Sequence, residues 1–312
     1  MNKDDLQRLV KLEDRINQIA EEEMGLKFIP IEWDIVPPQK MMEIMAYRIP
    51  TNIGSWKFGR DMERYRTIFD NSDYSSLPYE VVVYSNPARA YLMNSNTLAV
   101  QVLVMSHVVG HSAFFKINKW FQNARIDITS VMGAANERFK EYEKVYGVDE
   151  IETLVDAGHA LQLHSSPYDT ETEDEKRQRV FSQKKLMKKA TKAEFDDINI
   201  VNKTELQSVD MYNTKLWRKL RETTPVEPTA DLLRYIIDNS KRLEDWQKDI
   251  LETLRAEGQY YWPLIRTKIM NEGFACIVHG KIMDQLFHEG LLSSSEHGQY
   301  NYSNSMVKAE NK

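Results

Sequence analysis

Apolar residues recur at helical spacing over most of this chain, and this pattern predicts a mainly α-helical protein. Residues 4–24 place leucine, valine and isoleucine on one helical face, and Gly25 is a natural stop. The stretch 97–118 differs, because its first part is apolar nearly all round and so predicts a helix that is buried on every side. The same periodicity predicts five further helices, at residues 126–146, 149–164, 230–239, 243–256 and 260–288.

One stretch of the chain carries a sheet pattern. EVVVYS at 80–85 and RAYLM at 89–93 flank Asn86-Pro87 and predict two adjacent strands joined by a turn. Four prolines interrupt residues 27–75, so we expect that segment to be irregular apart from a short helix at 40–46. The predicted fold class is α+β: mainly α with a small antiparallel β-sheet, in which the strand pair directly precedes the helix at 97–118.

Composition changes between residues 166 and 228, where aliphatic residues are few and mixed charges are dense, as in ETEDEKRQR. We expect a solvated charged connector there. It separates an N-terminal part, residues 1–165, from a C-terminal helical part, residues 229–312. The N-terminal part holds the strand pair and the buried helix, and we expect the two parts to pack together as one catalytic-type domain.

Composition and charge exclude several classes of protein. The 312-residue chain is 42% hydrophobic, enough for a sizeable core, and its formal charge of -6 does not fit a dedicated nucleic-acid or membrane-surface protein. The single cysteine, Cys276, excludes an internal disulfide and fits a reducing compartment. The charged start is unlike a signal peptide, and the apolar run at 97–110 is too short to span a bilayer. We therefore expect a cytoplasmic protein with no membrane span.

The buried helix carries two histidines four positions apart, His107 and His111. This spacing places both imidazoles on one face, one turn apart, where they can chelate a single ion. Because buried imidazoles need polar partners, something must satisfy both rings. A divalent metal ion, zinc above all, would do so, and so would a buried carboxylate; both alternatives stay open.

A second polar face is predicted on the helix at 260–288. Glu272 and His279 are seven positions apart, so they share a face. The pair could be a surface glutamate and a capping histidine, but the apolar flanks of Glu272 place it in or near the interior, where carboxylates are normally paired or bound to metal. We expect His107, His111 and Glu272 to converge as metal ligands, with His279 as a fourth ligand or an oxyanion stabiliser.

The strand pair, the HxxxH helix and the downstream glutamate together resemble glutamate-type zincin peptidases, in which such ligands hold zinc and leave one position open. In that pattern a glutamate follows the first histidine and acts as general base, but here the position is Val108. If the protein is an enzyme, another group must take this role, and we consider Glu137, His159 and His279. Glu137 could equally be a solvated carboxylate, and His159 could instead orient a ligand.

Three longer strings are similar to the SpoVR family, named for a stage V sporulation protein. They are HVVGHSAFFKIN (107–118), LEDWQKDIL (243–251) and TKIMNEGFACIVHGKI (267–282), and the resemblance covers most of residues 5–300. A fourth segment ending in DAGHAL places His159 among the matches. Two positions depart from the family pattern: Phe274, where tryptophan is expected, and Ala113, where an acidic residue is expected.

The resemblance implies a cytoplasmic protein linked to spore cortex formation in spore formers. It also implies relatives in non-sporulating bacteria and some archaea, often encoded beside a serine kinase. Family members are usually longer, so we expect this chain to lack a C-terminal portion.

Two functions follow from the resemblance and the site. One is a zincin-like metal-dependent hydrolase acting on peptide or amide bonds of cell-wall precursors. The other is a non-catalytic regulator or scaffold in sporulation or stress signalling that keeps the cluster and binds protein partners.

Overall fold

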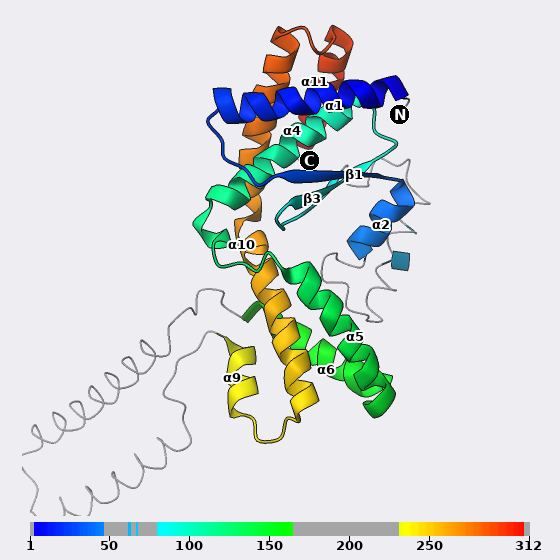
Figure 1. Cartoon of the computed structure of the whole chain (residues 1–312), viewed down its shortest axis with the longest axis vertical. Helices are drawn as coiled ribbons and strands as arrows, with labels where there is room; N and C mark the ends of the chain where they lie inside the picture. Colours follow the sequence, from blue (N-terminus) through cyan, green and yellow to red (C-terminus); the bar gives the residue numbers. More distant parts are fainter. Residues whose placement is uncertain (1–2, 47–61, 64–66, 68–79, 165–230, 309–312) are drawn as a thin grey trace, which may run out of the picture.

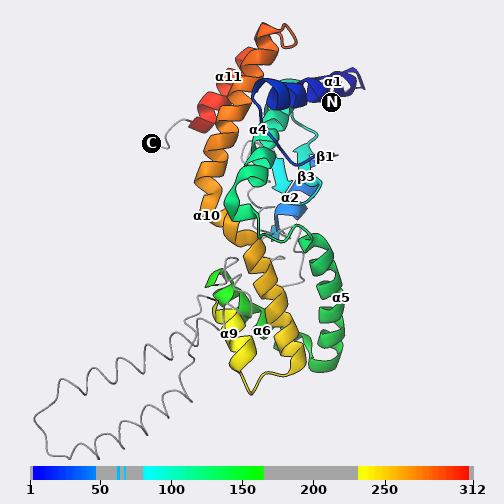
Figure 2. The ribbon, with the colours of Figure 1, turned by 60° about the vertical axis from the view of Figure 1, so that its left-hand side comes forward.

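A 44-residue helix, α10 (Asp245–His288), organises the structure, and most of the other helices pack along it (Figures 1 and 2). The computed structural model describes residues 3–46, 62–63, 67, 80–164 and 231–308, so the predicted connector at 166–228 lies outside the described residues. In chain order, the further elements used below are α1 (Lys3–Gln18), β1 (Ile31–Val36), α2 (Pro38–Ala46), β2 (Glu80–Val83), β3 (Ala88–Met93), α4 (Leu98–Ile117), α5 (Ile128–Tyr146), α6 (Val148–Leu161), α9 (Leu232–Asn239) and α11 (Ser294–Lys308).

Helix α10 replaces the two helices predicted at 243–256 and 260–288, and that prediction was wrong. Gly258 and Pro263 both weaken a helix locally, since glycine costs backbone entropy and proline lacks an N–H donor. Both residues are buried inside α10. The N-terminal half of the helix lies beside α5, α6 and α9, and its C-terminal half lies beside α4 and α11 (Figure 1). Tertiary packing along both halves therefore outweighs the local propensity to break.

The sheet has three strands in the order β1-β3-β2. Strands β2 and β3 are antiparallel, as predicted, but β1 pairs in parallel with β3, so the sheet is mixed rather than antiparallel. Strand β1 lies inside the segment that we expected to be irregular. Its partner β3 is more than fifty positions away, and such a distant pairing leaves no local pattern in the sequence. The short helix expected at 40–46 is confirmed as α2.

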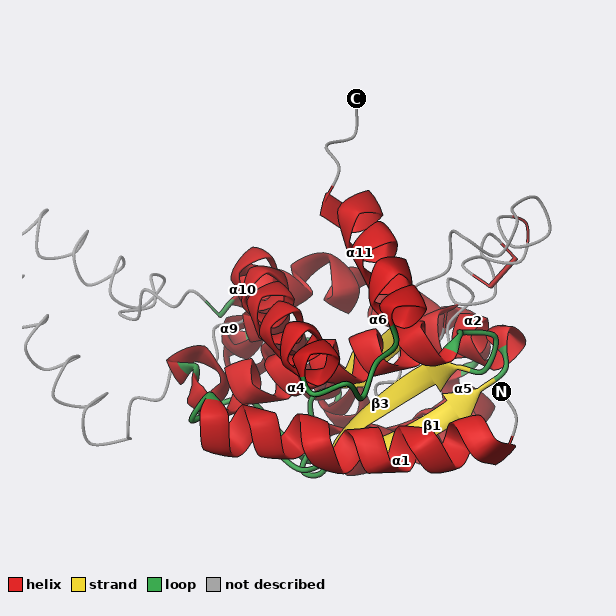
Figure 3. Cartoon of the chain, turned by 90° about the horizontal axis from the view of Figure 1, so that it is seen from above, coloured by secondary structure: helices red, strands yellow, loops and turns green. Residues whose placement is uncertain are grey.

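Helices cover the two faces of the sheet in different ways. Ala90 and Leu92 of β3 belong to the core shared with α1, α4 and the C-terminal half of α10. The alternate residue Met93 packs with Met41 and Met42 of α2 on the other face. Figure 3 shows α1 lying across the strands. A second core joins α5, α6 and the N-terminal half of α10.

Helix α4 is the buried helix that the sequence predicts. Thr97 caps it by accepting a hydrogen bond from the Val100 N–H at 3.4 Å, a standard N-cap contact. By length and composition only, α4 could cross a membrane, since an 18-residue window within its 20 residues has a mean hydropathy of 1.5; the apolar helix extends beyond the run 97–110 that was considered from the sequence. Because 83% of the apolar window is buried inside the structure, α4 has the environment of a core helix.

The predictions for the remaining helices hold with small shifts at the ends. The pattern at 4–24 forms α1, which continues as a π-helical turn, Ile19–Glu23, before Gly25 with its φ of +65°. Helices α5, α6 and α9 occupy the predicted stretches. The strand pair β2–β3 directly precedes the HxxxH helix, as predicted.

Helices α4 and α10 approach each other closely at Gly110. A Cβ atom placed on Gly110 would lie 2.7 Å from the Cα and 3.1 Å from the Cβ of Ala275, closer than packed carbon atoms come. Only glycine therefore allows α4 to lie this close to α10.

We expect Gly110→Ala to lower the free energy of unfolding by about 1–3 kcal/mol, because the added methyl group meets the α10 backbone. The matched control is Gly273→Ala on α10, where a Cβ atom would meet nothing within 4 Å. Alanine favours helix, so this change should be neutral or stabilise by up to about 1 kcal/mol. Urea denaturation of both variants measures the difference, and equal effects would contradict the close contact.

Candidate metal centre

His107 and His111 face the C-terminal half of α10, as their spacing on α4 predicts. Their ring centroids are 4.5 Å apart. The Nε2 atom of His107 lies 3.4 Å from Oε2 of Glu272, and the Nε2 atom of His111 lies 3.8 Å from the same oxygen. The expected convergence of these three residues is therefore present, although α4 and α10 are far apart in the sequence.

The other nitrogen of His111 contacts an amide. Nδ1 of His111 lies 2.9 Å from Oδ1 of Asn271, and a carboxamide oxygen only accepts, so Nδ1 is the donor. In the neutral ring, Nε2 then carries the lone pair, and it points toward Glu272 and Glu80. Asn271 thus sets the tautomer that a metal ligand needs.

His107 is held in a similar way by a second histidine. Its Nδ1 atom lies 2.9 Å from Nδ1 of His279, whose Nε2 atom is 3.3 Å from Oδ1 of Asn304. The Asn304 oxygen accepts a hydrogen from His279 Nε2, so His279 Nδ1 is the acceptor and His107 Nδ1 the donor. The lone pair of His107 is then on Nε2, toward the carboxylates. Asn304 in turn donates to the Tyr300 hydroxyl at 3.2 Å and extends this chain of hydrogen bonds into α11.

A third element contributes a carboxylate that the sequence analysis missed. Oε1 of Glu80, the first residue of β2, lies 3.6 Å from Nε2 of both His107 and His111. Its second oxygen, Oε2, is buried and has no hydrogen-bond partner among the residues that the structure describes. Glu80 pairs with Leu92 across the strands and so shares the sheet face that α4 covers. The three valines after Glu80 are apolar on both faces, so strand alternation gives no sign of its direction.

Burial and charge shift two pKa values in the cluster. Burial by itself would lower the pKa of His111, but hydrogen bonding and charge from Glu80, helped by Asn271 and Glu272, raise it overall. A hydrogen bond from the His107 ring, which needs a proton on Nε2 in the metal-free protein, lowers the pKa of Glu272 against the opposing effect of burial. Both shifts have the direction expected when imidazoles and carboxylates are forced together.

The donor set fits a divalent ion. Two imidazole nitrogens and two carboxylate oxygens face one another at 3.4–3.8 Å. A tetrahedral ion with bonds of about 2.0–2.1 Å holds its ligand atoms about 3.3–3.5 Å apart, so small movements would complete the geometry. The exposed fractions are 7% for His111, 15% for His107 and 18% for Glu80, while Glu272 is 50% exposed. Solvent therefore reaches the cluster on the Glu272 side.

A second group of possible ligands adjoins the first. His107, Cys276 and His279 each offer one ligand atom, and these atoms lie within 4.8 Å of one another. In this group His107 would use Nδ1, the atom that now contacts His279. The hydrogen-bonded pair at 2.9 Å favours a supporting role for His279 in the first group.

Two of the candidate bases lie elsewhere in the structure. The Glu137 side chain is 75% exposed on α5 and pairs with Lys140 one turn on, as the solvated alternative predicts. Nε2 of His159 on α6 lies 3.3 Å from the buried Glu257, which also accepts a hydrogen bond from Gln162. The structure brings neither residue to the cluster, because α5 and α6 pack on the other half of α10. Val108 is fully buried in the core.

The raised pKa of His111 gives a test in metal-free protein. Glu80→Gln should lower that pKa, because the carboxylate that favours the imidazolium is gone. A folded-state pKa above the unfolded value means that protonation stabilises the fold at low pH, and this stabilisation is lost as pH rises through the folded pKa. NMR titration of the His111 ring measures the change. Glu137→Gln, a control at an exposed site, should leave the pKa of His111 as it is, whereas an unchanged pKa in Glu80→Gln would contradict the assigned contact.

Comparison with known proteins places this site in a family. The chain is 32% identical over 275 residues to the uncharacterized protein YcgB of Escherichia coli (strain K12), a match that covers 84% of this chain and 50% of that protein. The chain thus spans about half the length of the curated relative it matches. No solved structure matches it, so the zincin-like arrangement gains no support from a known fold.

The family model described as "SpoVR like protein" matches residues 3–312. This match runs to the last residue, so it does not bear out our expectation that a C-terminal portion is missing. It includes both histidines of α4, the α10 residues that face them and Glu80. The chain therefore belongs to the SpoVR-like family.

Proposed function

We propose that this chain is a metal-dependent hydrolase whose centre is built on His107, His111 and Glu272. One observation carries the proposal: two imidazole Nε2 atoms and two carboxylate oxygens, all of them able to accept, converge with N–O distances of 3.4–3.8 Å. Such acceptors repel one another unless a cation or a proton lies between them. Zinc is the ion that best suits a set of histidines and carboxylates at this spacing.

When bound, a divalent ion at this position would lower the pKa of water and polarise a carbonyl group. The general base is assigned to Glu80 and not to the bases considered from the sequence. Its Oε1 atom faces both histidines, and Oε2 is buried without a partner among the described residues, so it is placed to accept a proton from the attacking water. Glu80 thereby takes the role that the zincin pattern gives to the residue at Val108.

His279 and Asn271 act through the ligands in this proposal. Each holds the Nδ1 atom of one imidazole and so keeps its Nε2 lone pair directed at the centre. This is a positioning role for His279, in place of the fourth ligand or oxyanion stabiliser considered from the sequence. Glu272 is half exposed, so a substrate carbonyl could approach the centre from its side.

A non-catalytic regulator is the second candidate, and two observations favour it. Glu80 could serve as a fourth ligand, which would close a tetrahedral site to substrate. Val108 is buried where a zincin has its base. Such a regulator would keep the ion for stability alone.

The family resemblance extends the proposal to the setting in the cell. We infer a cytoplasmic protein that acts on peptide or amide bonds of cell-wall precursors, with spore cortex precursors as the case in spore formers. A serine kinase encoded nearby is the protein partner that the resemblance favours. The test is whether the kinase co-purifies with the tagged chain, and whether substitutions at exposed positions of the chain abolish that co-purification.

Metal binding should depend on the α4 histidines. We expect protein purified without added metal to contain about one divalent ion per chain, and His107→Ala to lose it, because removal of one ligand also leaves buried polar groups unsatisfied. His159→Ala is the matched control, since it also removes a histidine that contacts a buried carboxylate, Glu257, but lies outside the centre. Elemental analysis of both variants measures the difference. If chelator leaves the melting curve of the wild type unchanged and no metal co-purifies, a hydrogen-bonded cluster replaces the metal centre.

Glu80 separates the hydrolase from the regulator. If Glu80 is the base, Glu80→Gln should keep the metal but lower turnover of peptidoglycan stem-peptide amides by about 10²–10⁴-fold. If Glu80 is a ligand, the same change should release the metal. Turnover and metal content are measured on one preparation, with Glu137→Gln as the control. A metal-loaded wild type that hydrolyses none of these amides would favour the regulator.

A further inference from the structure

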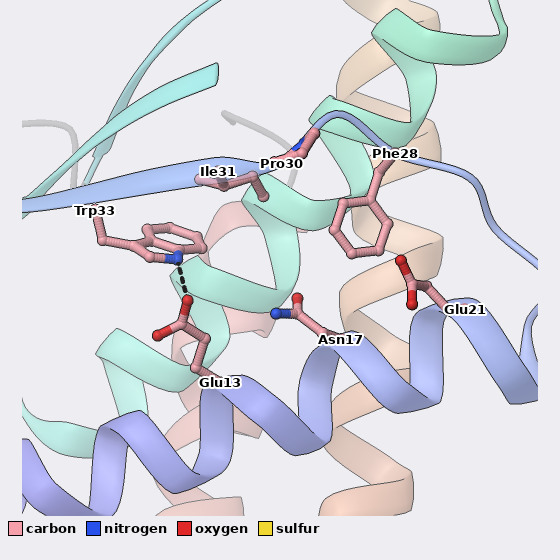
Figure 4. Close-up of a pocket in the computed structure, with 7 residues that line it drawn as sticks. All are labelled: Glu13, Asn17, Glu21, Phe28, Pro30, Ile31 and Trp33. Carbon is pink, nitrogen blue, oxygen red and sulfur yellow. Dashed lines mark hydrogen bonds between the residues drawn. The ribbon is translucent and has the colours of Figure 1, made fainter. Parts of the chain in front are cut away.

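Donor side chains outside the proposed centre gather closely in one place and remain apart in another. In the cavity between α1 and β1, Glu13 and Glu21 both line the helix side (Figure 4), but they are eight positions apart, about 12 Å along a helix. One ion cannot contact both carboxylates. In contrast, the ligand atoms of His107, Cys276 and His279 all lie within 4.8 Å of one another. This second arrangement can surround a single ion.

Helix α10 brings two of these donors to the face that meets α4. Cys276 and His279 are three positions apart, so they are neighbours on the helix surface. Glu272, one turn before Cys276, lies on the same face and contacts His107. One face of α10 therefore carries a carboxylate for the proposed centre and, next to it, a thiol and an imidazole.

The ring of His107 lies between the two groups of donors. Its Nε2 atom faces Glu272 at 3.4 Å and Glu80 at 3.6 Å, and its Nδ1 atom lies 2.9 Å from Nδ1 of His279. An imidazole that gives up its N–H proton has a lone pair on each nitrogen, so it can bind one ion at each edge of the ring. His107 can thus belong to both groups at once.

His279 already has the tautomer that a ligand needs. Its Nε2 atom is 3.3 Å from Oδ1 of Asn304, an oxygen that only accepts, so the lone pair of His279 is on Nδ1. That lone pair points toward His107 and accepts the hydrogen of its Nδ1 atom. Only 5% of His279 is exposed, and Asn304 holds the ring from the other side. A metal ion would take the place of the hydrogen without turning this ring.

We propose that Nδ1 of His107, Nδ1 of His279 and the Cys276 thiolate form a second metal site, which binds zinc or a similar divalent ion beside the proposed centre. Thiolate ligands favour zinc over the hard ions magnesium and calcium. Zinc bonds of about 2.0–2.1 Å to nitrogen and about 2.3 Å to sulfur hold neighbouring ligand atoms about 3.3–3.6 Å apart. The three donor atoms are close enough for side-chain rotation to reach these distances.

The charges balance when the ion enters this second site. The ion brings two positive charges, and two protons leave for solvent, one from the Cys276 thiol and one from Nδ1 of His107. His279 loses no proton. The buried group therefore gains no net charge, and this limits the cost of burying the ion.

The order of filling follows from these protons. The proposed centre offers lone pairs and ionised carboxylates, whereas the second site must release two protons before it can bind. We therefore expect the first ion to fill the proposed centre and the second ion to fill the thiolate site. The second ion would then fix the ring of His107 in the same direction as the hydrogen bond to His279 does. The site shares His107 with the proposed function but does not require hydrolysis.

Cobalt distinguishes the two sites, because a cobalt–thiolate bond gives a charge-transfer band in the near ultraviolet that nitrogen and oxygen ligands do not give. Cys276 is the single cysteine of the chain, so any such band arises from it. The full chain, freed of metal, is titrated with Co²⁺, and bound cobalt and the spectrum are measured after gel filtration. We expect about two ions per chain, with the band growing over the second equivalent.

Two variants and a matched control identify the ligands. Cys276→Ser should bind one ion fewer and lose the band while the proposed centre keeps its ion. His279→Ala should also lose the band, because the thiolate and one imidazole nitrogen hold the ion weakly. His288→Ala removes an exposed histidine of the same helix, outside both groups, and should keep both ions and the band. Cys276 is partly exposed, so Cys276→Ser should fold even if His279→Ala does not.

Each other result has one meaning. One bound ion per chain without the band would overturn the thiolate site and leave the proposed centre in place. One bound ion with a band that Cys276→Ser abolishes would support the thiolate site and contradict the proposed centre. No bound cobalt would overturn both. A band that persists in His279→Ala would come from a thiol that binds cobalt by itself, and it would overturn the proposal.

Discussion

The close approach of α4 and α10 at Gly110 is the constraint on which the candidate centre depends. His107 and His111 flank Gly110 on one helix, and their partners on the other helix flank Ala275. A side chain at position 110 would meet the α10 backbone, so the two helices could not keep their present separation. The imidazole–carboxylate distances of 3.4–3.8 Å would then be lost, because an imidazole ring cannot lengthen to follow a displaced helix.

A second layer of hydrogen bonds turns this contact into a defined arrangement. Asn271 holds one imidazole and His279 holds the other, and Asn304 holds His279 in turn. Each of these hydrogen bonds fixes which nitrogen of the neighbouring imidazole ring carries the hydrogen. In the neutral rings, the direction of both Nε2 lone pairs is therefore set by residues outside the candidate centre, an arrangement that is common around metal ligands.

The sheet contributes the fourth acceptor, and this gives the site its asymmetry. Glu80 enters from β2 on one side of the histidines, is mostly buried and keeps one unpaired oxygen. Glu272 enters from α10 on the other side and is half exposed. The two carboxylates thus sit in different environments, and groups with different environments can take different roles in acid–base chemistry. Under the proposed hydrolase function, an apolar Val108 is compatible with such chemistry because the strand, rather than the helix, would supply the general base, Glu80.

Local periodicity in the sequence determined most of the helices, the strand pair and the shared faces that carry His107, His111 and Glu272; it gave neither α11 nor the continuity of α10. These properties repeat every two or every 3.6 residues, so neighbouring positions reveal them. Tertiary structure decided the rest. Strand β1 depends on a partner more than fifty positions away, and α10 continues through Gly258 and Pro263 because two separate cores pack on its halves. Tertiary structure also placed Glu80 at the histidines and Glu137 in solvent. The packing of the whole chain decides which elements come into contact, and the pattern within a single element does not reveal it.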